Sequence, residues 1–313
     1  MWTSTTGPAW GLVLAGGEGS RLRSLTRQIS GDPRPKQFCK ILDGETLLER
    51  TRRRADLVAR LDRQVVVVTR AHEPYYRDLA RELAPERLVV QPDNRGTAAG
   101  ILYPLLRIRQ LAGDVPVAIF PSDHYVSDDV AFAGYVRAAL DIVRHGPELV
   151  TLLGIDPSTP EIEYGWIEPA AIPLPIDGEP AFPIRRFWEK PSPRLAQWLW
   201  SNGALWNSFV MVGQVDAFLR LLWRGVPELL VAFDPIRRAL GGPDEAAAAE
   251  TVYAGLQSVN FSDRVLTPSP DRLVTVRVKG VDWSDWGNPQ RVLATVQRAG
   301  WRPPWLDRVE FAV

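Results

Sequence analysis

The chain has 313 residues, enough for one large α/β domain or two smaller ones, and its 45% apolar and 24% charged content is ordinary for a globular protein. Its 37 basic and 37 acidic side chains cancel to a formal net charge of zero, so charge gives no reason to expect nucleic acid or an anionic membrane as a partner. No apolar run approaches the roughly 20 residues of a membrane span, and the first eight residues lack signal-peptide features, which together indicate a cytoplasmic protein.

The first half of the chain alternates apolar runs with amphipathic stretches. The run Val65-Val66-Val67-Val68 is typical of a strand buried on both faces, whereas apolar residues between 132 and 143 recur at helical spacing. This alternation predicts a parallel sheet with helices on both faces. Ligands bind such sheets beyond the carboxyl ends of the strands, so we expect the loops after Leu14, Val90 and Phe120 on one rim. The predicted strands span residues 9–14, 64–69, 88–90, 115–120 and 149–155, and the predicted helices span residues 46–61, 73–83 and 132–143.

Prolines become dense after about residue 156, which predicts an inserted lobe of short strands and loops. Later patterns predict helices at residues 194–201, 215–223, 244–254 and 289–299, and a strand at residues 273–278. Since no linker separates two independent units, we predict one domain over residues 1–299 and a tail over residues 300–313. The tail carries Trp301 and Trp305, which must dock or expose apolar surface, and this favours a subunit contact such as a homodimer.

A glycine-rich loop, Leu14-Ala15-Gly16-Gly17-Glu18-Gly19-Ser20-Arg21-Leu22, follows the first predicted strand. Glycines there let the backbone approach a ligand closely and turn its N–H groups into an anion-binding nest. The loop lacks the Gly-Lys-Ser/Thr ending of a Walker A motif and the third glycine of a dinucleotide fingerprint. Arg21 adds a guanidinium that can clamp phosphate oxygens in bidentate fashion.

The basic segment Pro33-Arg34-Pro35-Lys36-Gln37-Phe38 follows this loop. Its two prolines stiffen the chain around Lys36, and a rigidly held lysine suits the neutralisation of charge on a phosphate under attack. The structural alternative is a proline-rich turn with solvated basic side chains.

Together the two segments resemble the sugar-1-phosphate nucleotidyltransferases, and the Lys-Gln-Phe form is most similar to mannose-1-phosphate guanylyltransferase. The resemblance implies a Rossmann-like mixed, mostly parallel sheet flanked by helices, with a nucleotide half over about residues 1–156 and a sugar-side lobe over about residues 157–299. It also implies that the glycine loop with Arg21 holds the triphosphate, and that Lys36 stabilises charge around the α-phosphate.

A later segment, Gln91-Pro92-Asp93-Asn94-Arg95-Gly96-Thr97-Ala98, resembles the family segment that meets the base and starts a helix. Capping of that helix by Asn94 or Thr97 is the structural alternative, and both roles can coexist. The nucleotide-binding residues implied by the resemblance are Leu14, Ala15, Gly16, Gly17, Gly19, Ser20, Arg21, Gln91, Asn94, Gly96, Thr97 and Ala98.

Two aspartates match metal-ligand positions of the family. Asp123, in Phe120-Pro121-Ser122-Asp123-His124, follows a buried strand, where a carboxylate is well placed to hold Mg²⁺ against phosphates. Asp285 lies far along the chain, so its pairing with Asp123 as the Mg²⁺ ligands is implied by the resemblance alone. We interpret His124 not as a metal ligand but as a residue that either supports the ligands or stabilises the fold. The scattered histidines and the single cysteine, Cys39, make a zinc site or a disulfide framework unexpected. The implied catalytic set is Arg21, Lys36, Asp123 and Asp285.

Three short segments resemble the sugar side of the family: Glu161-Ile162-Glu163-Tyr164-Gly165, Glu189-Lys190-Pro191 and Trp206-Asn207-Ser208. Carboxylates and amides suit hydroxyl recognition because they form directional hydrogen bonds. The residues implied to bind the sugar phosphate are Tyr164, Gly165, Glu189, Lys190 and Asn207. The chain departs from the family's pattern at Ser20, at Trp286, at Asn288-Pro289 and over residues 259–262.

The expected reaction is an in-line attack of a sugar 1-phosphate oxygen on the α-phosphate of a nucleoside triphosphate, with release of pyrophosphate. The nucleophile is already an anion, so catalysis would consist of positioning and charge stabilisation. GTP and mannose 1-phosphate are the implied substrates. The alternatives are a thymidylyl- or uridylyltransferase acting on glucose 1-phosphate, and a catalytically silent protein that binds a nucleotide sugar and regulates an enzyme.

Overall fold

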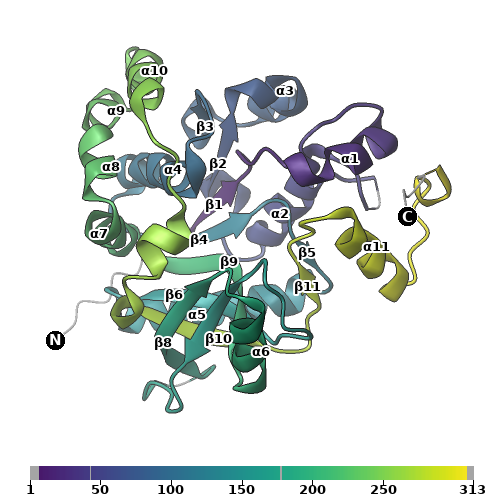
Figure 1. Ribbon diagram of the computed structural model, residues 1–313. Helices are drawn as coiled ribbons and strands as arrows, with labels where there is room; N and C mark the ends of the chain where they lie inside the picture. The colour runs from purple at the N-terminus through teal and green to yellow at the C-terminus, as the bar shows by residue number, and fades with distance from the viewer. Residues whose placement is uncertain (1–6, 43, 177, 309–313) are drawn as a thin grey trace.

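The computed structural model describes residues 7–42, 44–176 and 178–308. A nine-stranded sheet runs through its centre in the order β3-β2-β1-β4-β9-β6-β10-β8-β7 (Figure 1). Its strands are β1 (Trp10–Leu14), β2 (Gln64–Thr69), β3 (Leu88–Gln91), β4 (Pro116–Pro121), β6 (Val150–Ile155), β7 (Gly165–Pro169), β8 (Ala181–Glu189), β9 (Leu205–Gln214) and β10 (Leu273–Val278). A separate two-stranded ribbon joins β5 (Tyr125–Val126) to β11 (Trp283–Ser284).

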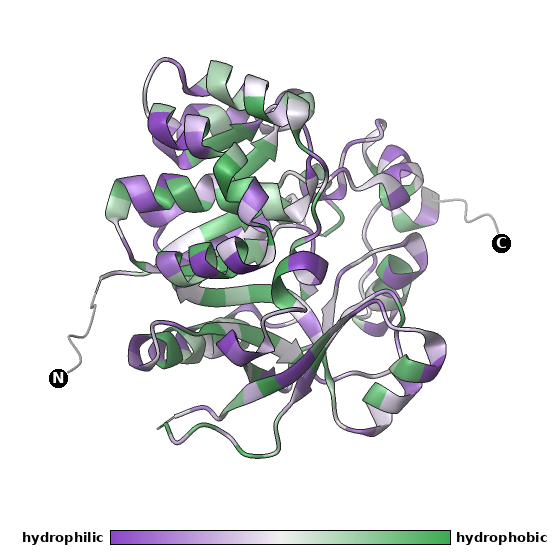
Figure 2. Cartoon of the chain, turned by 60° about the vertical axis from the view of Figure 1, so that its left-hand side comes forward, coloured by the Kyte–Doolittle hydropathy of each residue, from purple (hydrophilic) through white to green (hydrophobic). Residues whose placement is uncertain are grey.

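Helices cover both faces of the sheet because successive strand residues point to opposite sides. Val65 and Val67 pack into one apolar layer with α4 and α7, while Val66 and Val68 pack into the other with α2 and α5. Figure 2 shows the apolar strands sandwiched between helices whose polar residues face outward. The helices are α1 (Arg23–Ser30), α2 (Leu47–Asp56), α3 (Glu73–Glu82), α4 (Gly96–Ala112), α5 (Asp129–His145), α6 (Pro193–Ser201), α7 (Val215–Gly225), α8 (Pro227–Ala232), α9 (Asp234–Ala239), α10 (Glu245–Gly255) and α11 (Pro289–Arg298). None of the helices in the described ranges is both long and apolar enough to cross a membrane.

The predicted strands are confirmed, and the parallel pairs β1–β2, β2–β3, β1–β4 and β6–β10 form as expected. The central strand β9 was not predicted, and it runs antiparallel between β4 and β6. Asn207 and Ser208 interrupt its apolar pattern, yet both are buried and bonded. The Asn207 Oδ1 accepts from the Phe209 N–H at 3.1 Å, and the Ser208 hydroxyl donates to the Leu153 carbonyl at 2.7 Å.

The proline-rich stretch after residue 156 continues the same sheet. β7 and β8 pair antiparallel with each other, and β8 also pairs with β10. β7 further contacts β9. Counting directions along these pairings, seven of the nine strands run one way and only β8 and β9 oppose them, so the mixed, mostly parallel sheet is confirmed.

The tail docks on its own chain. Trp305 is buried and donates its indole N–H to the Ile41 carbonyl at 2.9 Å. Trp301 meets Tyr125 edge-on with the ring centroids 5.5 Å apart, and Tyr125 stacks on Trp286 at 5.4 Å. The tail therefore packs against its own chain, which is one of the two outcomes expected from the sequence. A homodimer stays a prediction, and tail residues 309–313 lie outside the described ranges.

Candidate active site

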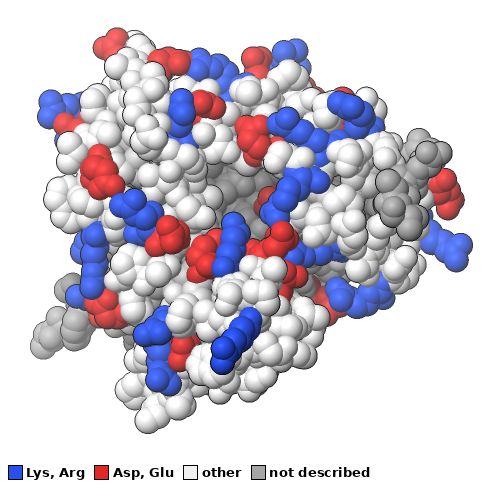
Figure 3. All heavy atoms as spheres, in the orientation of Figure 1, with Lys and Arg blue, Asp and Glu red and all other residues white. Residues whose placement is uncertain are grey.

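A cleft opens at the carboxyl ends of β1, β3 and β4, where the loops after Leu14, Gln91 and Pro121 meet as predicted. Three adjoining cavities of about 340, 290 and 260 Å³ fill it. Leu14 and Gly17 line the first two, and Asp123 lines the second and third. Figure 3 shows a hollow near the centre of this face with basic and acidic side chains gathered around it.

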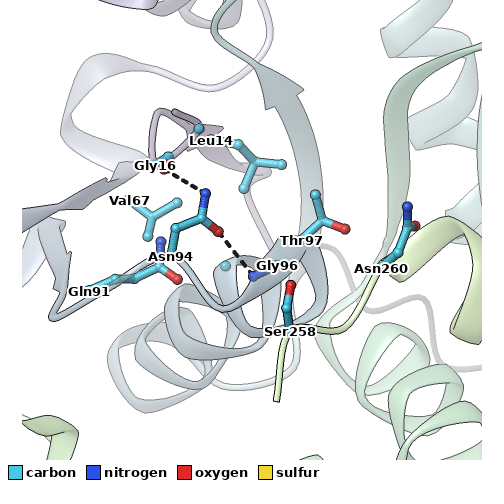
Figure 4. Close-up of a pocket in the computed structure, with 11 residues that line it drawn as sticks. Leu14, Gly16, Val67, Gln91, Asn94, Gly96, Thr97, Ser258 and Asn260 are labelled. Carbon is cyan, nitrogen blue, oxygen red and sulfur yellow. Dashed lines mark hydrogen bonds between the residues drawn. The ribbon is translucent and has the colours of Figure 1, made fainter. Parts of the chain in front are cut away.

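The first cavity lies between the glycine loop and the start of α4, as Figure 4 shows. Asn94 ties these two segments together, because its Nδ2 donates to the Gly16 carbonyl at 3.4 Å and its Oδ1 accepts from the Gly96 N–H at 3.0 Å. Gly96 has a φ of 83°, and a Cβ there would lie 2.4 Å from the Val259 carbonyl oxygen, so only glycine fits. Asn94 therefore accepts a hydrogen bond from the first N–H of α4 and also lines the cavity. The sequence had left both roles open for this residue.

Most of the predicted nucleotide-binding residues border this cavity or the third one. Thr97 does not cap α4 with its side chain, since its hydroxyl accepts a hydrogen bond from the Phe261 N–H at 2.8 Å. Ala15 and Ala98 are buried and line none of the three cavities. The predicted residues on the first cavity are Leu14, Gly16, Gly17, Gln91, Asn94, Gly96 and Thr97, and those not predicted are Val67, Gly100, Ser258 and Asn260.

The third cavity is bordered by Gly19, Ser20, Arg21 and Lys36. Gly19 has a φ of 56°, and a Cβ there would come within 3.0 Å of the Lys36 backbone nitrogen. Gln37, quoted in the family motif but given no role, donates its Nε2 to the Ala15 carbonyl at 3.0 Å and to the Gly17 carbonyl at 2.7 Å. The basic segment therefore holds the glycine loop in place.

Lys36 is buried, with only 8% of its side chain exposed. Its Nζ donates to the Asp285 carbonyl and, at 3.2 Å, to the Trp286 carbonyl, and it lies 3.2 Å from Asp123 Oδ2. Trp286 has a φ of 46°, which is strained for a bulky residue. Strained backbone conformations of this kind cluster at functional sites. The solvated-turn alternative is therefore wrong for Lys36, which joins the two aspartate segments.

Asp285 is an ionised carboxylate held by three donors. Its Oδ1 accepts from the Tyr164 hydroxyl at 3.1 Å, the Gly287 N–H at 2.8 Å and Arg291 Nη1 at 2.9 Å. Burial acts to raise the pKa of Asp285, but Lys36, His124, Arg291 and the Gly287 N–H outweigh it and hold that pKa below its usual value.

Asp123 and Asp285 line one cavity and suit a hard, oxygen-seeking cation such as Mg²⁺. The hydrogen bonds to Asp285 fall on Oδ1, and among the described residues none falls on Oδ2. No cluster of three or more His, Cys, Asp or Glu side chains able to hold a metal occurs within the described ranges.

Arg291, near the start of α11, was not predicted as a site residue from the sequence. Its Nη2 lies 2.8 Å from Glu161 Oε2 and 3.0 Å from Glu163 Oε2, and its guanidinium lies 4.5 Å from the centroid of the Tyr164 ring. The same Glu163 oxygen is 3.4 Å from Arg21 Nη1. A chain of charges therefore spans the cleft from Asp285 to the glycine loop, and no local spacing in the sequence signals it.

The second cavity gathers the predicted sugar-side residues Tyr164, Gly165, Glu189 and Asn207. A Cβ on Gly165 would lie 2.9 Å from Phe187 Cζ and 3.1 Å from Glu189 Oε2, so this position also demands glycine. Burial raises the pKa of Glu189, although nearby Lys190 opposes the shift.

Lys190 is the one sugar-side residue that the cavity does not include. Its side chain is 58% exposed, with Nζ 3.7 Å from Glu189 Oε1. His124 and Trp283, which were given no binding role, do line the cavity, and their rings meet edge-on at 5.2 Å. Burial, Lys36 and Arg54 hold the pKa of His124 below its usual value, which keeps the imidazole neutral near pH 7.

The chain is similar to several known proteins. The chain is 28% identical over 296 residues to the xanthan biosynthesis protein XanB of Xanthomonas campestris pv. campestris, covering 92% of this chain and 60% of that protein. It is 28% identical over 284 residues to a mannose-1-phosphate guanylyltransferase of Escherichia coli, covering 88% and 57%. A crystal structure described as a mannose-1-phosphate geranyltransferase from Thermus thermophilus superposes with a TM-score of 0.76 at 29% identity, covering 95% and 80%.

The chain spans about three fifths of the length of these curated relatives. The nucleotidyl transferase family model matches residues 10–298, which is nearly the whole chain. The resemblance found in the sequence is thus confirmed, and the chain belongs to the nucleotidyl transferase family.

Proposed function

We propose that the protein transfers a nucleotidyl group from GTP to mannose 1-phosphate, forming GDP-mannose and releasing pyrophosphate. The observation that carries the proposal is the position of Lys36. Lys36 borders the third cavity, beside the glycine loop, and contacts Asp123 and the Asp285 carbonyl. Both aspartates border the second cavity, on the sugar side. A phosphate transferred between the two cavities would pass this cation.

The residues present suit a displacement that needs no general base. A sugar 1-phosphate is already an anion at neutral pH, so its oxygen can attack the α-phosphate directly, and catalysis rests on positioning and charge stabilisation. Lys36 is a buried cation held by three oxygen atoms. Arg21 lines the third cavity beside Gly19 and Ser20 of the glycine loop. Arg21 pairs with Glu163, and triphosphate oxygens would compete for that guanidinium.

The sugar side offers hydroxyl-binding groups in a confined space. Glu189, Asn207 and Tyr164 line one cavity and can form directional hydrogen bonds with a sugar. When bound, Mg²⁺ would be held by Asp123 and Asp285 and would neutralise phosphate charge.

The choice of guanine and mannose is supported by the relatives, several of which are described as mannose-1-phosphate guanylyltransferases at 24–29% identity. A thymidylyl- or uridylyltransferase acting on glucose 1-phosphate is the alternative enzyme. A silent regulatory protein is disfavoured because the charged site is intact: Lys36 contacts both Asp123 and the Asp285 carbonyl in the cleft.

The test is pyrophosphate release from each nucleoside triphosphate with a panel of sugar 1-phosphates and Mg²⁺. We expect the highest rate with GTP and mannose 1-phosphate, and a silent panel would refute the proposal. Asp285→Asn should lose at least about 100-fold in kcat. Asp282→Asn is the matched control, since Asp282 is 59% exposed and pairs only with Arg298 among the described cations. Equal activity of the two variants would contradict the role given to Asp285.

A further inference from the structure

A buried tyrosine contacts one of the residues that line the first cavity. Tyr253 lies on α10 with 1% of its surface exposed, and its hydroxyl is 3.0 Å from Oε1 of Gln91. Gln91 ends β3 and lines the cavity beside the glycine loop. The two residues are 162 positions apart, so only the tertiary fold brings them together.

The direction of this hydrogen bond follows from burial. Burial raises the pKa of Tyr253 well above its ordinary value, so the hydroxyl keeps its proton. Gln91 is the one hydrogen-bond partner of this hydroxyl within the described ranges. If the hydroxyl accepted from the amide instead, its own proton would be left unpaired, at a cost of about 1–3 kcal/mol. The hydroxyl therefore donates, and Oε1 of Gln91 accepts.

The other end of the Gln91 side-chain amide, Nε2, is then an N–H donor. Figure 4 shows Nε2 of Gln91 on the side of the amide that faces Gly16. A Cβ on Gly16 would lie 2.6 Å from this nitrogen. The neighbouring side-chain amide of Asn94 is already paired at both ends, because it donates to the Gly16 carbonyl and accepts from the Gly96 N–H. Gln91 thus presents an N–H donor to the cavity in an orientation that the amide cannot reverse without breaking the bond to Tyr253.

We propose that Tyr253 is a specificity-determining residue that locks Gln91 as a donor, and that the cavity thereby selects nucleotides whose base carries a carbonyl oxygen at the contacted edge. Guanine, uracil and thymine have such a group, whereas adenine and cytosine carry an amino group there. An amino group facing Nε2 would leave two donors opposed, and a mismatch of buried polar groups is what gives such sites their selectivity. The proposal rests on the nucleotidyl transfer proposed above and adds how the base is read.

The decisive comparison is Tyr253→Phe against Tyr103→Phe. Tyr103 belongs to the same aromatic cluster, with its ring centroid 6.3 Å from that of Tyr253, but its hydroxyl donates to Glu245 at 2.8 Å and not to Gln91. We would measure kcat/KM of pyrophosphate release for GTP, UTP, dTTP, ATP and CTP. The wild type should favour the first three. Tyr253→Phe should lower the ratio of kcat/KM for the best of these three to kcat/KM for ATP by about 10-fold, which corresponds to the loss of one hydrogen bond. Tyr103→Phe should leave this ratio unchanged.

A second variant keeps the proposal testable if Tyr253→Phe fails to fold. Gln91→Glu keeps the acceptor for Tyr253 but replaces the donor by an acceptor, so the preference should move toward ATP or CTP. A wild type that favours ATP or CTP, or a Tyr253→Phe enzyme with an unchanged base ratio, would overturn the proposal. If no substrate pair releases pyrophosphate, the proposed transferase reaction is wrong, but the proposed base selectivity can still be tested. Calorimetric binding of the same five nucleotides would then measure the preference among the bases.

Discussion

Replacement of Arg291 by methionine is the sharpest test of how the site is held. The substitution keeps much of the side chain's length but removes the cation shared by Asp285, Glu161 and Glu163. It also removes the guanidinium from the face of Tyr164. We expect the variant to fold with lower stability and to bind Mg²⁺ more weakly, because Asp285 Oδ1 loses one of its three donors.

The magnitude follows from burial. The Arg291 side chain is 15% exposed, Asp285 17% and Glu161 23%, so these two pairs are largely shielded from solvent. Truncating one member of a buried pair costs about 3–5 kcal/mol. Glu163 is 42% exposed, so its contact adds little. We therefore expect the free energy of unfolding to fall by about 3 kcal/mol and the Tm by about 5–10 °C.

The loss should depend on pH. Burial acts to raise the pKa of Asp285, and Arg291 is among the charges that outweigh it. The stability that Arg291 contributes through this carboxylate is present above the unfolded pKa of about 4 and is lost as the pH falls through the lower folded pKa. The Tm difference between wild type and variant should be large at pH 7–8 and should shrink below about pH 4.

The assay is thermal unfolding across this pH range together with Mg²⁺ titration of pyrophosphate release. Removing a residue that orients a metal ligand typically costs 10–100-fold in metal affinity or activity, so the half-saturating Mg²⁺ concentration should rise by about that factor. Arg298→Met is the matched control, since Arg298 lies on the same helix but is 55% exposed in its pair with Asp282. If Arg291→Met matched this control in both measurements, the reasoning would be refuted.

Three further predictions concern Glu189, the glycine loop and the tail. Glu189→Gln should raise the Tm more at pH 8 than at pH 4, because burial raises the pKa of Glu189 and its ionised form is unfavourable in the folded state. Glu189→Gln should also raise the KM for the sugar phosphate. An equal Tm change at both pH values would contradict the raised pKa of Glu189. Gly19→Ala should lower the Tm, since φ is 56° and a Cβ would crowd Lys36, whereas Gly17→Ala meets no atom within 4 Å and should raise the nucleotide KM with the Tm unchanged. Trp305→Ala should cost about 3–5 kcal/mol in chemical unfolding, and a loss below about 1 kcal/mol would show that the tail is dispensable.

Local patterns in the sequence were enough for much of the framework. The valine run at residues 65–68 forms a strand buried on both faces, and the apolar spacing between 132 and 143 lies within α5. Both patterns work because side chains repeat with the geometry of the element itself. The central strand β9 escaped prediction because its buried polar residues are satisfied by particular partners, and a local pattern does not contain those partners.

The candidate site divides in the same way. Glycine at positions 16 and 19 and a rigid lysine at position 36 could be proposed from short segments, since backbone freedom and stiffness are local properties. The sugar-side set rested on resemblance, and the structure brings four of its five residues to one cavity while Lys190 stays outside. Their roles remain predictions for the experiments above.

Only the tertiary structure revealed the contacts that give these residues their chemical character. Lys36 meets the Asp285 segment across 249 positions, and Tyr253 meets Gln91 across 162. Arg291 of α11 meets Glu161 and Glu163 in the loop before β7. Hydrogen bonds and ion pairs act over a few ångströms of space, whatever the separation along the chain. The sequence by itself therefore determined which functional groups are available, and the fold decided which of them are paired, buried or turned toward the cleft.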